Sequence, residues 1–196
     1  MHLFIEGERG SGKSTLILDL IRPYLYAAGG FGTIRLLGED GRVKGYAQVA
    51  ASELERVNDR YQEDLPGLFV ERRGDHMVSR PEVLTEYTLP LLDQKGAAFY
   101  LMDEIGGVEL QIPAWRQRLM ALLEGEVPCI GVWKSPDNCV KLRRRIPGFE
   151  ADYEQMRAWL KQNPNVCLLE ARQDNREKVQ AALERWKCVH LERLER

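Results

Sequence analysis

The chain has 196 residues, 44% of them hydrophobic and 30% charged, which predicts a single domain over residues 1–196 with one sizeable core. The formal net charge of −2 lacks the basic excess of proteins that bind a nucleic-acid backbone, which disfavours a nucleic-acid partner. No apolar run approaches the roughly 18 residues of a membrane span, which disfavours a membrane partner. The four cysteines are scattered, which disfavours a structural zinc site and a disulfide framework and favours the cytoplasm.

The N-terminal segments alternate between strand-like and helix-like patterns. Residues 2–6 are a short apolar run that predicts a strand. Residues 13–28 carry leucine and isoleucine at helical spacings, and the Gly29-Gly30 pair is expected to end that helix. Residues 31–37 and 43–49 flank an Asp-Gly turn, which predicts a β-hairpin.

The middle of the chain holds a polar stretch and then a buried strand. Residues 50–80 are polar and mixed, with one short strand predicted at 68–71. Pro81 is expected to open a helix that runs to about residue 95, because proline is well tolerated in a first helical turn. Residues 97–103 are a continuous apolar run ending in an acid, which is typical of a parallel strand buried on both faces. A helix is expected over 113–124, from a proline to the residue before a glycine.

The last third repeats the alternation of strand and helix. Residues 128–133 predict another buried strand, residues 165–171 a last strand, and residues 174–194 a closing helix. The charged, proline-punctuated stretch 134–164 is expected to hold one short helix and a longer one near 150–162, as a lid-like segment. Strands alternating with helices predict an α/β domain with a mainly parallel sheet.

One motif indicates a phosphate-binding loop, which directly follows the first predicted strand and opens the first predicted helix. Its residues match G-x-x-x-x-G-K-[S/T] and are Gly7, Glu8, Arg9, Gly10, Ser11, Gly12, Lys13 and Ser14. In such a P-loop, glycines let backbone N–H groups converge on phosphate oxygens, the lysine reaches the β- and γ-phosphates, and the serine offers a hydroxyl to Mg²⁺. We therefore predict a nucleotide site that also includes Thr15, next to Ser14.

A pair of acids at the end of the buried strand supplies the second candidate element. In P-loop proteins, an aspartate at the carboxyl end of a neighbouring strand holds Mg²⁺, which is the role expected for Asp103. Glu104 follows directly, and a carboxylate there is suited to deprotonate the water that attacks the γ-phosphate. Simpler interpretations are a turn or cap residue for Asp103, and for Glu104 a cap or a contact with a second substrate.

The sequence resembles the small P-loop nucleoside-triphosphatases first described from thermophiles, also called cancer-related nucleoside-triphosphatases. Besides the P-loop, the resemblance rests on Gly-Phe-Gly-Thr at 30–33, LMDEIGGVEL at 101–110, and Asn175-Arg176 after the last strand. The fold it implies is a three-layer α/β sandwich with a mainly parallel central sheet and an inserted β-hairpin.

The resemblance also implies roles for individual residues. It implies phosphate binding by residues 7–14, Mg²⁺ at Ser14 and Asp103, catalytic assistance from Glu104, and a structural or site-forming role for Glu109. Its members hydrolyse ATP and GTP with broad base tolerance. The chain differs from the family where a lysine and a methionine are usual and residues 107–108 are Gly-Val.

Two further groups are candidate site residues. The basic run Arg143-Arg144-Arg145 lies where many P-loop enzymes carry a lid, so one arginine is a candidate for stabilising the transferred phosphoryl group; a solvated surface run is the simpler interpretation. Asn175 and Arg176 follow the last strand, at the edge where the nucleotide base is expected. Both are therefore predicted to bind nucleotide, with an N-cap role equally open for Asn175.

Three functions are consistent with these residues. The first is Mg²⁺-dependent hydrolysis of ATP or GTP, in which Lys13 binds phosphate and Glu104 activates water. The second is a kinase that passes the γ-phosphate to a nucleoside, a metabolite or a nucleic-acid end. The third is a nucleotide-dependent switch with little turnover, whose protein partner the sequence does not identify.

Overall fold

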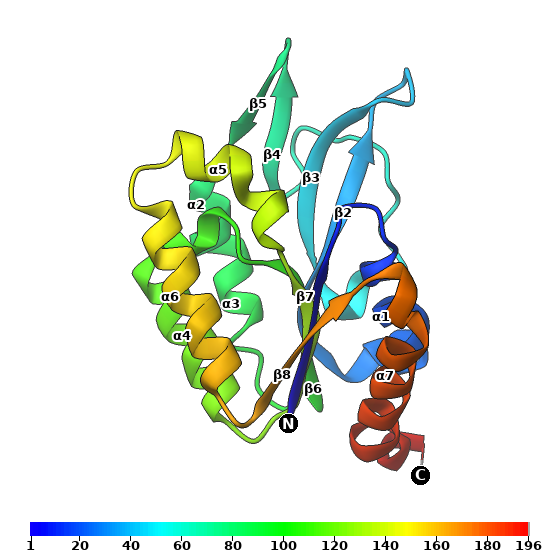
Figure 1. Ribbon diagram of the computed structural model, residues 1–196. Helices are drawn as coiled ribbons and strands as arrows, with labels where there is room; N and C mark the ends of the chain where they lie inside the picture. The colour runs from blue at the N-terminus through cyan, green and yellow to red at the C-terminus, as the bar shows by residue number, and fades with distance from the viewer. Residues whose placement is uncertain (196) are drawn as a thin grey trace.

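The computed structural model describes residues 1–195 and places eight strands in one mixed sheet, in the order β5-β4-β3-β2-β6-β7-β1-β8 (Figure 1). The strands are β1 (His2–Gly7), β2 (Ala28–Leu37), β3 (Val43–Ala50), β4 (Leu68–Arg73), β5 (His76–Ser79), β6 (Phe99–Ile105), β7 (Cys129–Trp133) and β8 (Val166–Ala171). The pairs β2-β6, β6-β7, β7-β1 and β1-β8 are parallel, whereas β2-β3, β3-β4 and β4-β5 are antiparallel. The predicted α/β fold with an inserted hairpin is confirmed, and β5 extends it by a strand that the sequence did not indicate.

Helices cover both faces of the parallel part of the sheet, which gives three layers (Figure 1). They are α1 (Lys13–Ile21), α2 (Pro81–Val83), α3 (Leu89–Leu91), α4 (Pro113–Glu124), α5 (Val140–Arg145), α6 (Phe149–Gln162) and α7 (Arg176–His190). In Figure 1, α1 and α7 lie on one side of the sheet, and α3, α4 and α6 lie on the other. No helix among residues 1–195 is long and apolar enough to cross a bilayer.

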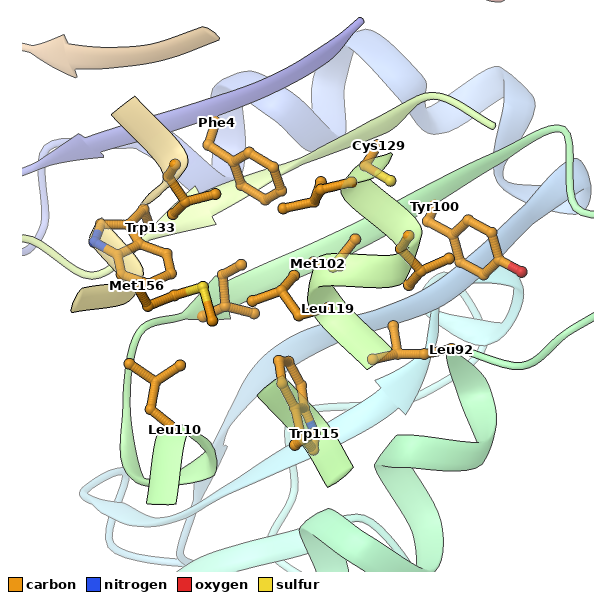
Figure 2. Packing of buried hydrophobic residues seen from close by; sticks show 14 of the residues in the cluster. Phe4, Leu92, Tyr100, Met102, Leu110, Trp115, Leu119, Cys129, Trp133 and Met156 are labelled. Atoms are coloured by element: carbon orange, nitrogen blue, oxygen red, sulfur yellow. The ribbon is translucent and has the colours of Figure 1, made fainter. Parts of the chain in front are cut away.

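Each layer has its own core, because successive side chains of a strand point to opposite faces. Phe4, Met102 and Trp133 pack with residues of α4 and α6 (Figure 2). Leu3 and Leu101, their neighbours along β1 and β6, pack instead with residues of α1 and α7. The strands are therefore apolar on both faces, which explains the continuous apolar runs in the sequence.

The helix expected over residues 13–28 is shorter than predicted. It ends at Ile21, and Arg22–Ala27 forms a 3-10 helix, since Pro23 has no N–H for an α-helical hydrogen bond. The Gly29-Gly30 pair, expected as the stop, belongs to β2. A glycine is required at Gly30 because its φ is +82° and a Cβ there would overlap the Leu101 carbonyl of β6.

Other boundaries agree more closely with expectation. The helix predicted over 113–124 is α4, and the short and long helices expected within 134–164 are α5 and α6. The segment from Pro81 is helical only to about Leu91 and includes a π-helical turn at 84–88. Pro90, just after this turn, has no N–H to donate back into it as an α-helical hydrogen bond. The closing helix α7 spans a narrower range than the predicted 174–194.

A buried carboxylate ties the antiparallel part of the sheet together. Glu71 of β4 is 2% exposed and accepts hydrogen bonds from Tyr61 Oη at 2.9 Å and Arg73 Nε at 2.6 Å. Arg80 forms an ion pair with the same carboxylate at 2.9 Å. The hydrogen bond from Arg80, followed by those from Tyr61 and Arg73, lowers the pKa of Glu71 to about 2.

We expect Glu71→Gln to destabilise the protein at pH 7 by on the order of 1–3 kcal/mol, because the arginines lose their buried partner. A carboxyl whose pKa is lowered by folding stabilises the folded state above its unfolded pKa, here about 4.5, and loses this contribution as the pH falls toward 2. Urea unfolding of both proteins at pH 7, 5 and 3 should therefore show a difference that shrinks below pH 4.5. Glu39→Gln, at the exposed tip of the β2–β3 hairpin, is the control. A difference that is the same at every pH would contradict the assignment.

Candidate functional site

The P-loop connects β1 directly to α1 at the carboxyl edge of the sheet. Gly12 precedes α1 with a φ of +80°, a left-handed backbone conformation that residues with a side chain rarely adopt. The first residue of the helix is Lys13, so the loop leads directly into the N-terminus of α1, where the first N–H groups have no partner within the helix. This local geometry provides the arrangement of donors that binds a phosphate anion.

Lys13 lies buried beneath the loop, although lysine is normally a surface residue. Its Nζ donates hydrogen bonds to the carbonyls of Gly7 at 3.0 Å and Glu8 at 2.5 Å, and to Ser11 Oγ at 3.1 Å. Burial lowers the pKa of Lys13, opposed by the negative charges of Glu104 and Asp103. The acids therefore help to keep the ammonium charged at the centre of the loop.

Asp103 joins the P-loop to the neighbouring strand β6. Ser14 Oγ donates a hydrogen bond to Asp103 Oδ1 at 2.8 Å, across 89 positions of sequence. Asp103 is 3% exposed, and desolvation raises its pKa to about 6, although the hydrogen bond from Ser14 acts in the opposite direction. Thr33 of β2 also donates a hydrogen bond to the Asp103 carbonyl. These contacts hold the carboxylate against the hydroxyl of the P-loop serine.

Glu104, the next residue, has a different environment. Its side chain is partly exposed and has no hydrogen bond or ion pair among residues 1–195. Its negative charge nevertheless acts on both Lys13 and Asp103, which places it beside the P-loop. A carboxylate that no protein donor occupies is free to accept a proton from a bound water.

Glu109 shapes the loop that follows these acids. It is 4% exposed, and its Oε1 accepts hydrogen bonds from the backbone N–H groups of Gly106 and Gly107, both at 2.6 Å. Burial raises the pKa of Glu109, while the charge of Lys134 and these backbone donors lower it. The contacts give Glu109 a structural function in the loop after β6.

A cleft of about 1190 Å³ opens at the P-loop, outside the carboxyl ends of β1, β7 and β8. Gly7 through Gly12 line it from one side, and the start of α7 lines it from another. Its size is in the range of small-molecule sites or somewhat larger. In an open α/β sheet, ligands bind in this type of position, beyond the carboxyl ends of the strands.

The predicted residues outside the P-loop motif differ in their relation to this cleft. Arg176 lines it. The Asn175 amide is engaged locally, since Oδ1 accepts from Arg172 N at 2.9 Å and Nδ2 donates to the Glu170 carbonyl at 2.7 Å. Thr15 is exposed in the first turn of α1. Arg176 is thus the member of this group best placed for a nucleotide.

None of the arginines of the basic run at 143–145 lines the cleft. Arg143 forms ion pairs with Glu150 and Glu154 of α6, at 3.1 and 2.7 Å. Arg157 lines the cleft instead and forms two hydrogen bonds with Glu6, at 2.6 and 3.0 Å. Nothing in the sequence indicated this pair, because the two residues are 151 positions apart. The lid role of 134–164 stays a prediction, and α6 is part of the packed core.

A model of a protein family described as NTPase matches residues 2–183 of this sequence. The chain belongs to this NTPase family. The match covers β1 through most of α7, so it includes the P-loop, Asp103, Glu104 and the cleft. A search of curated proteins finds no match.

Two solved structures resemble this NTPase family member over nearly their whole length. The crystal structure of THEP1 from the hyperthermophile Aquifex aeolicus is 19% identical, with a TM-score of 0.60, and the match covers 93% of this chain and 96% of that one. The solution structure of a human cancer-related nucleoside triphosphatase is 21% identical, with a TM-score of 0.58 and 96% coverage of both chains. At these identities the likeness establishes the shared fold.

Proposed function

We propose that this NTPase family member is a Mg²⁺-dependent enzyme that hydrolyses a nucleoside triphosphate to the diphosphate and phosphate. One observation carries the proposal: the hydrogen bond between Ser14 Oγ and Asp103 Oδ1 joins the phosphate loop to a buried acid, with Glu104 adjacent. The family membership and the fold of the triphosphatase neighbours support it.

The cleft accounts for binding of the substrate. Backbone N–H groups of Gly7 to Gly12 would cradle the phosphates, and Lys13 would exchange its loop carbonyls for β- and γ-phosphate oxygens. Beyond the end of β8, Arg176 would contact the base or ribose of ATP or GTP. Glu8 and Arg9, which line the cleft, and Thr15 in the first turn of α1 would take part through their backbone N–H groups.

The oxygen atoms of Ser14 and Asp103 fit a magnesium ion. Both are hard ligands, and they lie within hydrogen-bond distance of each other. Among the described residues, no group of three or more histidine, cysteine or acidic side chains is placed to hold a metal without help. This donor set suits an ion that is shared with substrate phosphates and water. When bound, Mg²⁺ neutralises charge on the β- and γ-phosphate oxygens.

Glu104 would act as the general base. It would accept a proton from the water that attacks the γ-phosphorus, while Lys13 offsets the negative charge that develops on the phosphoryl oxygens. Its free carboxylate, next to the acid that would hold the metal, supports this role.

Phosphate release tests the reaction directly. We expect the purified protein to release phosphate from ATP and GTP, and to lose this activity on removal of Mg²⁺ with EDTA. Release should not depend on an added acceptor, and CTP and UTP serve to measure base tolerance. Label from the γ-phosphate that appears on a nucleoside, a metabolite or a nucleic-acid end would instead assign a kinase. Tight nucleotide binding with no turnover above buffer would assign a switch.

A further inference from the structure

Ser135, directly after β7, carries a buried hydroxyl that the fold does not use. The residue is 6% exposed, and its Oγ has no hydrogen-bond partner within residues 1–195. Burying a hydroxyl without a partner is unfavourable, so such groups in native proteins commonly serve a ligand or a functional purpose. Ser135 also lines the cleft together with the glycines of the P-loop.

The position of β7 in the sheet indicates which part of a nucleotide Ser135 would meet. β7 lies between β1, which leads into the P-loop, and β6, which carries Asp103. Ile5 and Asp103 are both register partners of Val132, so the chain after β7 leaves the sheet between Gly7 and the acids. The part of the cleft near Arg176, where the base would lie, is on the other side of β1, beyond β8.

A second contact fixes the segment after β7 against the P-loop. Asn138 Nδ2 donates a hydrogen bond at 3.2 Å to the Gly7 carbonyl, which also accepts one from Lys13 Nζ. The backbone N–H of Asn138 in turn donates to the Ser135 carbonyl at 3.0 Å. The backbone of Ser135 is thus held in place, while rotation about its Cα–Cβ bond is enough to redirect the hydroxyl.

We propose that Ser135 Oγ donates a hydrogen bond to the terminal phosphate of the bound triphosphate. The inference rests on the proposed nucleotide function and adds to it a residue that distinguishes a triphosphate from a diphosphate. A terminal phosphate held between Lys13 and the Ser14–Asp103 pair would lie above the end of β7, where Ser135 leaves the sheet, because β7 lies between β1 and β6. A diphosphate would leave the hydroxyl without its acceptor.

The test compares Ser135→Ala with Ser135→Thr, which keeps a hydroxyl. Affinities for ADP and for a non-hydrolysable ATP analogue are measured by calorimetry with Mg²⁺. We expect Ser135→Ala to weaken the triphosphate analogue by about 10- to 100-fold, as for loss of a hydrogen bond to a charged group, and to leave ADP unchanged. Ser135→Thr should restore most of the difference. Ser79→Ala, an exposed serine on β5, is the control.

Thermal unfolding without nucleotide separates this role from a structural one. Because the hydroxyl has no partner within residues 1–195, Ser135→Ala should unfold at the same temperature as the unsubstituted chain or higher. Equal weakening of ADP and the triphosphate analogue, no weakening of either, or a lower unfolding temperature would each overturn the proposal. Binding and thermal unfolding are both measured without hydrolysis. An absence of phosphate release would therefore contradict the proposed reaction, whereas the binding measurements alone decide the role of Ser135.

Discussion

Replacement of Lys13 by alanine is expected to weaken binding of a nucleoside triphosphate by at least about 100-fold and to remove phosphate release. Loss of one partner of a buried, hydrogen-bonded charge pair typically costs about 2–5 kcal/mol, and about 1.4 kcal/mol corresponds to a factor of ten. Lys13 is the buried ammonium at the centre of the P-loop, and its three hydrogen bonds are all to atoms of that loop. The loop amides alone would then hold the β- and γ-phosphates.

Calorimetry with ATP and Mg²⁺ measures the loss of binding, and a phosphate assay measures the loss of turnover. Lys13→Met is a useful second variant, since it keeps most of the buried chain length and removes the charge. Lys95→Ala, exposed before β6, changes the net charge equally and should leave both readouts unchanged. Affinity within about threefold of the unsubstituted chain in Lys13→Ala would contradict the assignment of the phosphate site, since a change of that size is well under 1.4 kcal/mol.

Replacement of Glu104 by glutamine is expected to lower kcat by about 100- to 10,000-fold, the range for loss of a general base. Binding should change little, because the substitution keeps the shape of the side chain and Glu104 makes no hydrogen bond within the part of the chain that the structure describes. Its negative charge opposes the lowering of the pKa of Lys13 by burial, so a small change in affinity follows from that charge.

Single-turnover phosphate release, together with nucleotide affinity, separates the two effects for Glu104→Gln. Glu126→Gln, exposed in the turn before β7, is the matched control for loss of one carboxylate. Unchanged turnover in Glu104→Gln would exclude Glu104 as the base. Reduced turnover with a parallel loss of affinity would instead indicate that Glu104 acts in substrate binding, and another residue would then have to supply the base.

Much of the fold was predictable because its signals are local. The apolar runs that became β1, β6, β7 and β8 are continuous, since those strands are covered on both faces. Errors arose where backbone constraints from the tertiary structure outweighed local pattern. Gly30 is expected as a helix stop but lies in β2, where it pairs with Leu101 of β6 and where β6 leaves no space for a side chain. Strand β5 is short and mostly exposed, and its two hydrophobic residues, Met77 and Val78, are adjacent, so it shows no alternation to detect.

For the site, the sequence by itself determined the P-loop, because binding phosphate with backbone amides requires glycines and a lysine at fixed spacing. It also singled out Asp103 and Glu104, as acids that end a buried apolar run. Only the tertiary structure decided which distant groups meet: Ser14 with Asp103, Arg157 with Glu6, and Ser135 with the cleft. These neighbours depend on the strand order β6-β7-β1-β8, which pairs segments that are far apart in the chain. Such pairings leave no periodic signal in a single sequence, because each residue satisfies its own local pattern whichever strand lies beside it.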